Sequence, residues 1–257
     1  METARHVEML ERESHAFGRR IVDADMAAAV PSCPGWTIAD LGWHLTSVQH
    51  FWGTIAEDLL GDPSDVPDAD RVDDPLLAIA FQSASHRLIE AVRRHPPTAR
   101  CWTWDHEEGT IGWVARRQHH EAAIHRVDIE QAIGVDAVLD DESALDGIDE
   151  MIDVQLDGFP DWGRFESGPI VEIAPVGSHS RFIDVGEFCG SSPSTGTSYD
   201  GAAARRAPQG AAEATVSGPA SVIDMWMWGR TGLDRLAVSG DERLVAQLRS
   251  VIATETG

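Results

Sequence analysis

The chain contains the stretch Ser32-Cys33-Pro34-Gly35-Trp36-Thr37-Ile38-Ala39-Asp40-Leu41-Gly42-Trp43-His44-Leu45, which passes from a turn into a helix. Pro34 and Gly35 interrupt regular structure, because proline lacks the N–H donor that a helix interior requires. Thr37 followed three residues later by Asp40 resembles a capping box, in which two side chains satisfy the first backbone N–H groups of a helix. The sequence therefore predicts a helix that begins directly after Thr37.

This helix is predicted to be one of four. Its apolar residues recur at spacings of three and four, as on one face of an amphipathic helix: Ile38, Leu41, Leu45, Val48, Trp52, Ile55 and Leu59. Further amphipathic segments cover residues 3–28, 75–94 and 111–133. Four antiparallel helices with short connections favour an up-and-down bundle, in which metal and cofactor sites commonly lie in the core between facing helices.

The pattern changes in the last third of the chain. Segments rich in β-branched residues predict strands at 170–176, 181–185 and 213–217. Helices are predicted at 140–161, 220–229 and 242–252, and the Gly-, Ser- and Ala-rich residues 189–212 are predicted to form a long, mobile connection. We therefore expect an α+β fold of two domains, a four-helix bundle over residues 1–160 and a small α+β domain over residues 168–257.

Composition limits the classes of partner. The 257 residues carry a formal net charge of −23, and every basic residue is arginine. Nucleic acids and anionic membranes are bound through basic faces, so neither is expected as a partner. The lack of lysine excludes Schiff-base chemistry. No apolar run approaches the roughly 20 residues that span a bilayer. Because residues 1–20 also show no hydrophobic signal segment, we expect a cytoplasmic protein.

The three cysteines are Cys33, Cys101 and Cys189. They are widely separated, odd in number and form no CxxC pair, so neither a disulfide framework nor a cysteine zinc site is predicted. If the chain takes part in thiol chemistry, we expect the thiol to arrive as a small molecule.

A candidate metal site begins with Glu121 and His125. They are four residues apart, so on a helix they share a face with their Cβ atoms about 5–6 Å apart. His120 and His125 are five apart and point about 140° away from each other, unlike the two histidines of the HExxH motif in zinc proteases. Arg117 and Asp128 fall on the same side as Glu121. A solvated ion pair is the alternative interpretation of such a pair taken alone.

A third ligand has to come from another helix. His44 lies three residues after Leu41 and four before Val48, at the border of the apolar stripe, whereas His50 shares a polar face. A core histidine satisfied by hydrogen bonds is the alternative for His44. Two histidines and one glutamate leave coordination positions open, which is typical of a catalytic site. These nitrogen and oxygen donors suit zinc first and other divalent metals after it.

Several motifs, taken together, are similar to those of one enzyme family. In the first half they are Cys33-Pro34-Gly35-Trp36-Thr37, His44-Leu45 and the segment from His120 to Asp128, closing at Ala132-Ile133-Gly134. In the second half they are Val216-Ser217-Gly218-Pro219-Ala220, Trp228-Gly229-Arg230 and Val238-Ser239-Gly240-Asp241. The chain thereby resembles the mycothiol-dependent maleylpyruvate isomerase family, which belongs to the DinB-like metalloenzyme bundles. The resemblance touches both predicted domains.

The resemblance implies a DinB-like bundle with a divalent metal, usually zinc, on His44, Glu121 and His125. It also implies mycothiol as thiol cofactor or co-substrate, and a C-terminal domain whose arginine, matched by Arg230, faces the active site. Arginine suits a substrate carboxylate because it makes bidentate contacts; alternatively, Arg230 binds carbonyls at a helix end. In an isomerase of this kind, a metal-bound thiolate adds to a cis double bond, the bond rotates, and elimination leaves the trans product.

Three functions stay open at this point. The first is a metal- and mycothiol-dependent isomerase or S-transferase acting on a small electrophilic substrate that carries a carboxylate, because the family includes both reactions. The second is a metal enzyme on the same bundle that activates water instead of a thiol. The third is a non-catalytic bundle that binds a ligand or a protein partner.

Overall fold

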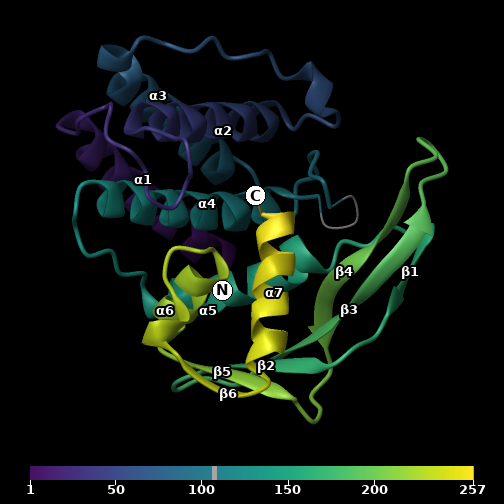
Figure 1. The fold of residues 1–257 in the computed structure, drawn as a ribbon. Helices are drawn as coiled ribbons and strands as arrows, with labels where there is room; N and C mark the ends of the chain where they lie inside the picture. The colour runs from purple at the N-terminus through teal and green to yellow at the C-terminus, as the bar shows by residue number, and fades with distance from the viewer. Residues whose placement is uncertain (106–108, 257) are drawn as a thin grey trace. The chain divides into compact units, whose positions relative to one another are not determined.

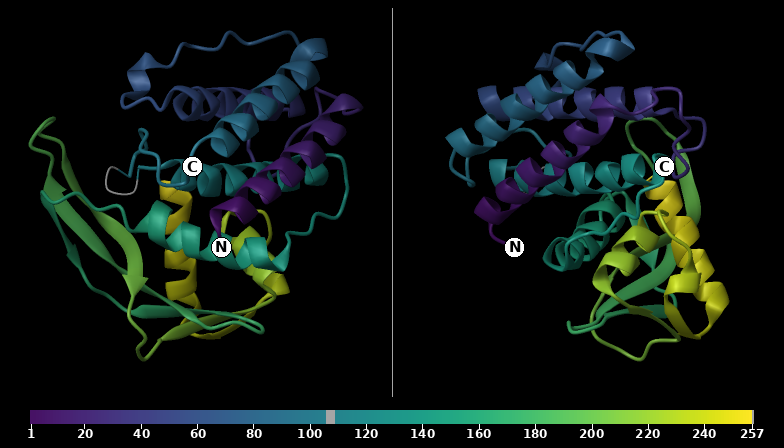
Figure 2. Two further views of the ribbon diagram at one scale, coloured as in Figure 1. Left: turned by 180° about the vertical axis from the view of Figure 1, so that it is seen from behind. Right: turned by 90° about the vertical axis from the view of Figure 1, so that its left-hand side faces the viewer.

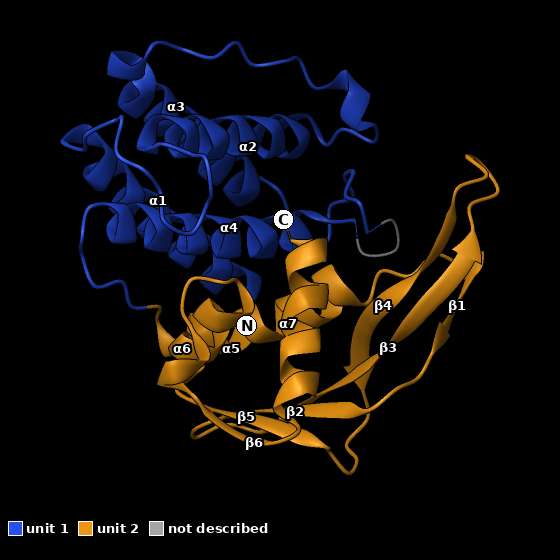
Figure 3. Ribbon diagram, in the orientation of Figure 1, with its two compact units in different colours: residues 1–138 blue, residues 139–257 orange. Residues whose placement is uncertain are grey.

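The computed structural model of the chain describes residues 1–105 and 109–256. It shows two compact units, residues 1–138 and residues 139–257 (Figure 3). The first unit is helical, and the second combines helices with one sheet (Figures 1 and 2). The predicted class, α+β with two domains, is confirmed. The division between residues 138 and 139 lies before the helix predicted at 140–161, whereas the predicted bundle domain extends to residue 160.

The first unit contains four long helices. They are α1 (Thr3–Val22), α2 (Ile38–Asp58), α3 (Leu77–Arg94) and α4 (Ile111–Ala132). Both α1 and α2 pack against α3 and α4, so the four helices form a closed bundle. Short 3-10 turns, Pro63–Asp65 and Asp74–Leu76, lie in the connection between α2 and α3. All four predicted helices are present, although α1 ends at Val22 rather than near residue 28.

The core of this unit explains why α2 takes its orientation. Leu41 and Leu45 are fully buried, as is Phe17 of α1, and the Phe17 ring lies 4.9 Å from the ring of Phe81 on α3. Each such side chain stabilises the fold by about 1.5–3 kcal/mol when it leaves water. Because Leu41 and Leu45 are fixed in the core, His44 is held at the edge of the apolar stripe.

The start of α2 confirms the predicted capping box. The Thr37 side chain accepts a hydrogen bond from the Asp40 backbone N–H, and the Asp40 carboxylate accepts one from the Thr37 backbone N–H. Just before it, the Trp36 N–H donates to the Cys33 carbonyl, and Gly35 has a φ of 86°. A positive φ at this place in a turn favours glycine, because it has no Cβ.

The second unit begins with α5 (Asp141–Glu150), which continues as a π-helical turn, Met151–Leu156. Its strands are β1 (Gly163–Glu166), β2 (Ile170–Pro175), β3 (Arg181–Ser191), β4 (Ser198–Ala207), β5 (Ala214–Gly218) and β6 (Ala237–Gly240). The sheet order is β1-β3-β2-β5-β6, with β4 also paired to β3. Strands β2 and β5 run parallel, and the other paired strands are antiparallel. Helices α6 (Ala220–Met227) and α7 (Glu242–Glu255) pack on this sheet (Figure 1).

The prediction of a mobile connection over residues 189–212 is wrong. Strand β3 extends to Ser191, and residues 198–207 form β4, which pairs with β3 along its whole length. Ala203 and Ala204, two of the small residues that had suggested a loop, are buried within strand β4. Strand β1 was not predicted. Among the described residues, no helix is long and apolar enough to cross a membrane.

Candidate metal centre

The three predicted ligands come together between α2 and α4. Oε1 of Glu121 lies 3.3 Å from Nε2 of His44 and 3.1 Å from Nε2 of His125. Each residue offers one ligand atom within 4.8 Å of the other two. Glu121 and His125 share one face of α4 because they are four residues apart, and His44 reaches them from α2. The structure therefore brings together the histidine–glutamate pair and the third residue that the apolar pattern of α2 selected.

Two more residues of α4 hold this group in place. Nη2 of Arg117 donates to Oε2 of Glu121 at 2.8 Å, which leaves Oε1 directed at the two histidines. Nδ1 of His125 lies 2.8 Å from Oδ2 of Asp128, which is fully buried. A carboxylate on one ring nitrogen of a histidine orients the ring and leaves the other nitrogen for a metal. Arg117 and Asp128 thus support the carboxylate and one imidazole from behind.

The loop before α2 contacts the carboxylate of Asp128. Oγ of Ser32 donates to Oδ1 of Asp128 at 2.5 Å, and Sγ of Cys33 lies 3.8 Å from Oδ2 of Asp128. The turn around Gly35 places both residues there. No role for Ser32 was predicted from the sequence. The available signal was the position of a hydroxyl residue directly before the Cys-Pro-Gly turn.

The electrostatics of the group follow from its burial and its charges. Burial alone would raise the pKa of the Glu121 carboxyl, but His125, His44 and Arg117 together hold that pKa well below its usual range. Burial alone would lower the pKa of His125, but the carboxylates of Glu121 and Asp128 outweigh it and raise the pKa to about 9. Without a metal, His125 is therefore a protonated imidazole between two carboxylates.

The group is accessible from the His44 side. The His44 side chain is 34% exposed, compared with 9% for His125. An open pocket of about 450 Å³ adjoins His44 and is lined by Trp36, Trp43 and Arg71 among others. The Trp36 ring lies 4.9 Å from the ring of His44. A small molecule entering this pocket meets His44 first, beside two aromatic rings and a guanidinium group.

The donor atoms fit a divalent metal. Zinc binds histidine nitrogen and carboxylate oxygen at about 2.0–2.2 Å, which separates neighbouring ligand atoms in a tetrahedron by about 3.3–3.5 Å. The two contacts of Glu121 Oε1, 3.1 and 3.3 Å, are close to this separation. Two imidazoles and one carboxylate leave room for further ligands, as in catalytic zinc sites.

Arg230, His50 and Cys101 each have local surroundings of their own. Arg230 follows α6 in the second unit, where Nη1 donates to the carbonyl of Trp228 at 2.5 Å, as expected for an arginine at a helix end. Nε2 of His50 lies 3.4 Å from the carbonyl of Pro67, away from the group. Cys101 is buried, and burial raises the pKa of its thiol to about 11, so this thiol stays protonated at neutral pH.

Comparisons with known proteins agree with this architecture. Residues 7–130 match the family model described as the mycothiol maleylpyruvate isomerase N-terminal domain, and residues 142–247 match that of the MDMPI C-terminal domain. No curated protein sequence matches the chain significantly. Among solved structures, the crystal structure of the mycothiol-dependent maleylpyruvate isomerase superposes with a TM-score of 0.64 at 16% identity, covering 94% of this chain and 95% of that one. A histidine-to-alanine mutant of the same enzyme gives a TM-score of 0.63 with the same identity and coverage. At this identity, the structural likeness shows a shared fold.

Proposed function

The chain belongs to the mycothiol-dependent maleylpyruvate isomerase family, and from this premise we propose that it is a divalent-metal- and mycothiol-dependent enzyme. Its reaction is an isomerisation or S-transfer on a small electrophilic substrate that carries a carboxylate. The proposal rests on one observation above the others. His44, Glu121 and His125 present their ligand atoms within 4.8 Å of one another at the edge of an accessible pocket.

The residues around this group have separate proposed roles. His44, Glu121 and His125 would hold the metal, with zinc favoured by the nitrogen and oxygen donors. When bound, such a metal lowers the pKa of a coordinated thiol so far that the thiol is present as the reactive thiolate at neutral pH. Asp128 fixes the orientation of the His125 ring, and Arg117 fixes the Glu121 carboxylate.

The difference in exposure among the three ligands supports a direction of approach. Glu121 and His125 are the more enclosed residues, whereas His44 borders the pocket with Trp36 and Trp43. An incoming thiol and substrate would therefore enter beside His44, where the indole rings can exclude water from their apolar parts. Arg230 is the proposed partner of the substrate carboxylate, on the family resemblance alone, because a guanidinium group binds a carboxylate in a bidentate manner.

The variant Glu121→Ala tests the proposal. It removes the carboxylate shared by both histidines, so the purified variant should hold one metal equivalent fewer than the unaltered chain. The cis–trans isomerisation of maleylpyruvate in the presence of mycothiol should fall by about 100-fold or more. Elemental analysis measures the metal content, and an absorbance assay measures the isomerisation. Calorimetric titration measures the binding of mycothiol. Glu57→Gln is the matched control, because Glu57 is a surface partner of Arg87.

The outcomes separate the candidate functions. Metal-dependent turnover that does not respond to mycothiol would contradict the thiol-dependent proposal and favour an activated water. A folded chain that holds no metal at this group would contradict both enzymatic functions. If Glu121→Ala retains full metal content and activity, the assignment of the ligands is wrong.

A further inference from the structure

A second group of potential ligands lies on another face of α4. His119 and His120 belong to α4, and His6 belongs to α1. All three are buried, with exposed fractions of 3% for His6, 0% for His119 and 2% for His120. Burying an imidazole costs free energy unless its ring nitrogens are satisfied. Three buried imidazoles thus lie side by side at the contact between α1 and α4.

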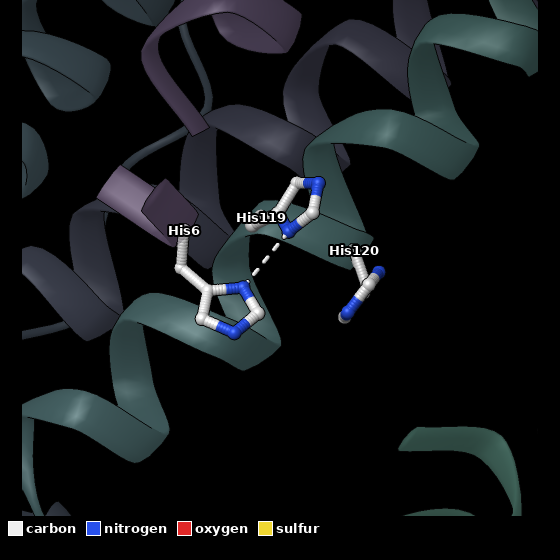
Figure 4. A group of neighbouring side chains, drawn as sticks. All are labelled: His6, His119 and His120. Carbon is white, nitrogen blue, oxygen red and sulfur yellow. Dashed lines mark hydrogen bonds between the residues drawn. The ribbon is translucent and has the colours of Figure 1, made fainter. Parts of the chain in front are cut away.

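The three rings are close enough to share a ligand. Nδ1 of His6 lies 3.1 Å from Nδ1 of His119. The ring centroids of His119 and His120 are 4.3 Å apart, and those of His6 and His120 are 6.0 Å apart. Each residue offers a ring nitrogen within 4.8 Å of the other two. Figure 4 shows the His6 and His119 rings pointing towards each other, with the ring of His120 next to them.

The separation of the His6 and His119 nitrogens matches what a metal requires. Tetrahedral zinc at about 2.0–2.1 Å from each nitrogen separates two ligand nitrogens by about 3.3 Å, close to the 3.1 Å between the two Nδ1 atoms. In the hydrogen bond between these atoms, one Nδ1 carries the proton and donates the hydrogen bond, and the other Nδ1 accepts it through its lone pair. A cation between them replaces this single proton and binds both lone pairs.

The residue type selects the class of ion. Imidazole nitrogen is a good ligand for Zn²⁺, Co²⁺, Ni²⁺ and Cu²⁺, whereas Mg²⁺ and Ca²⁺ prefer oxygen. The three donors are all imidazoles, so this group is distinct in chemistry from His44, Glu121 and His125, which include a carboxylate. The two groups also differ in access, since each of the three buried histidines is at most 3% exposed and His44 is 34% exposed in its side chain.

We propose that His6, His119 and His120 form a second site for a divalent transition-metal ion, which joins α1 to α4 inside the helical unit. The ion is bound by two residues of α4 and one residue of α1, so it can hold the first turn of α1 against α4. Its burial gives it a stabilising role rather than contact with substrate. An ion that binds only the folded chain raises the midpoint of thermal unfolding as its concentration rises.

The test uses the full chain with the first group disabled. Glu121→Ala, freed of metal with a chelator and then titrated with Co²⁺ alone, should bind about one equivalent. The visible absorption bands of Co²⁺ report its coordination, and the thermal midpoint should rise by several degrees on binding. Adding His6→Asn or His120→Gln to this variant should abolish the bound equivalent. His15→Asn, an exposed histidine on the same helix as His6, is the matched control and should retain it.

Two results would overturn the proposal. One is a folded Glu121→Ala chain, verified by circular dichroism, that binds no Co²⁺. The other is an equivalent that survives both His6→Asn and His120→Gln, which would place the ion elsewhere. If Glu121→Ala does not fold, the unaltered chain decides: two equivalents, one of them lost with His120→Gln, support the site, and a single equivalent rejects it. Because this readout is independent of mycothiol and of turnover, its failure leaves the proposed function untouched.

Discussion

Helix α4 carries two buried polar networks that differ in the residues completing them. One is centred on Arg126 and connects α4 to α1. The other is centred on Glu121 and connects α4 to α2. The two centres are only five positions apart in the sequence, and both networks place ionised groups where apolar side chains would be easier to bury. The difference lies in which groups neutralise the carboxylates.

The Arg126 network is closed by arginine. Nε of Arg126 donates to Glu13 of α1 at 2.5 Å, Nη1 donates to Glu130 at 2.5 Å, and Nη2 donates to the carbonyl of Val138 at 2.9 Å. The two carboxylates also receive bonds from arginines of α1, Arg12 and Arg20. A guanidinium group keeps its proton at every ordinary pH. This network therefore has one fixed state.

The Glu121 network is completed largely by histidine. Its carboxylate Oε1 faces two imidazoles, and its Oε2 is bound by a guanidinium group. An imidazole can lose its proton and offer a lone pair, so the same positions can hold a proton or a metal. Arginine makes a buried network permanent, whereas histidine makes it exchangeable. From this comparison we propose that the Arg126 network maintains the fold and that the Glu121 network supplies the chemistry of the proposed function.

The largest expected effect concerns the closed network. Arg126→Met removes the guanidinium group between Glu13 and Glu130 and leaves two buried carboxylates, which Arg12 and Arg20 still contact. Removing one partner of a buried ion pair costs about 3–5 kcal/mol, and we expect about 3 kcal/mol here because these two arginines remain. Denaturant unfolding of the purified variant measures this loss.

The matched control is Arg93→Met, because Arg93 forms its ion pairs with Glu11 and Glu90 on the surface. It should cost less than about 1 kcal/mol. Metal content should stay unchanged in both variants. A loss of metal in Arg126→Met without unfolding would contradict the proposal that the two networks have separate roles.

A smaller effect is expected from the residue behind His125. Asp128→Asn keeps the shape of the side chain but removes the charge that orients the His125 ring. Mutation of a residue that orients a metal ligand typically lowers metal affinity by about 10- to 100-fold. We expect the affinity of Asp128→Asn to fall by that factor while the fold is retained. Competition with a chelator of known affinity measures the change. Glu130→Gln, two residues further along α4, should leave metal affinity at this group unaltered, and an equal loss in both variants would contradict the comparison.

The residues of the Glu121 network were easier to predict from the sequence than those of the Arg126 network. Glu121 and His125 were found by their spacing, and His44 by its place beside Leu41 and Leu45, because helical periodicity fixes which residues share a face. Glu13 and Arg126 have no such relation, since they meet across two helices far apart in sequence. His119 was missed for the same reason, because its closeness to His6 depends on how α1 packs on α4.

The sheet shows a different limit. Residues 198–207 contain Gly201 and four alanines, which have low intrinsic preference for strands. They form β4 because β3 provides a partner for ten consecutive residues, from Phe182 to Ser191. Pairing with β3 thus outweighs the low local preference for a strand. This pairing cannot be recognised from the residues of β4 alone. The regular, periodic helices were predictable, whereas the second unit was predictable only in outline.

The smallest expected effect tests how α2 holds His44 against α4. Thr37→Ala removes the side chain that caps α2 and should cost about 1 kcal/mol at neutral pH. Hydrogen bonds from the Thr37 backbone and side chain, followed by Arg71, lower the pKa of Asp40 from 3.8 to about 2. The contribution of ionised Asp40 is therefore complete above about pH 4 and is lost as the pH falls towards 2. The cost of Thr37→Ala should shrink between pH 4 and pH 3 in urea unfolding.

Thr110→Ala, which removes the cap of α4 at the Trp113 N–H, should cost a similar amount at every pH in this range. If both costs change equally with pH, the Thr37–Asp40 contact is not what secures the start of α2.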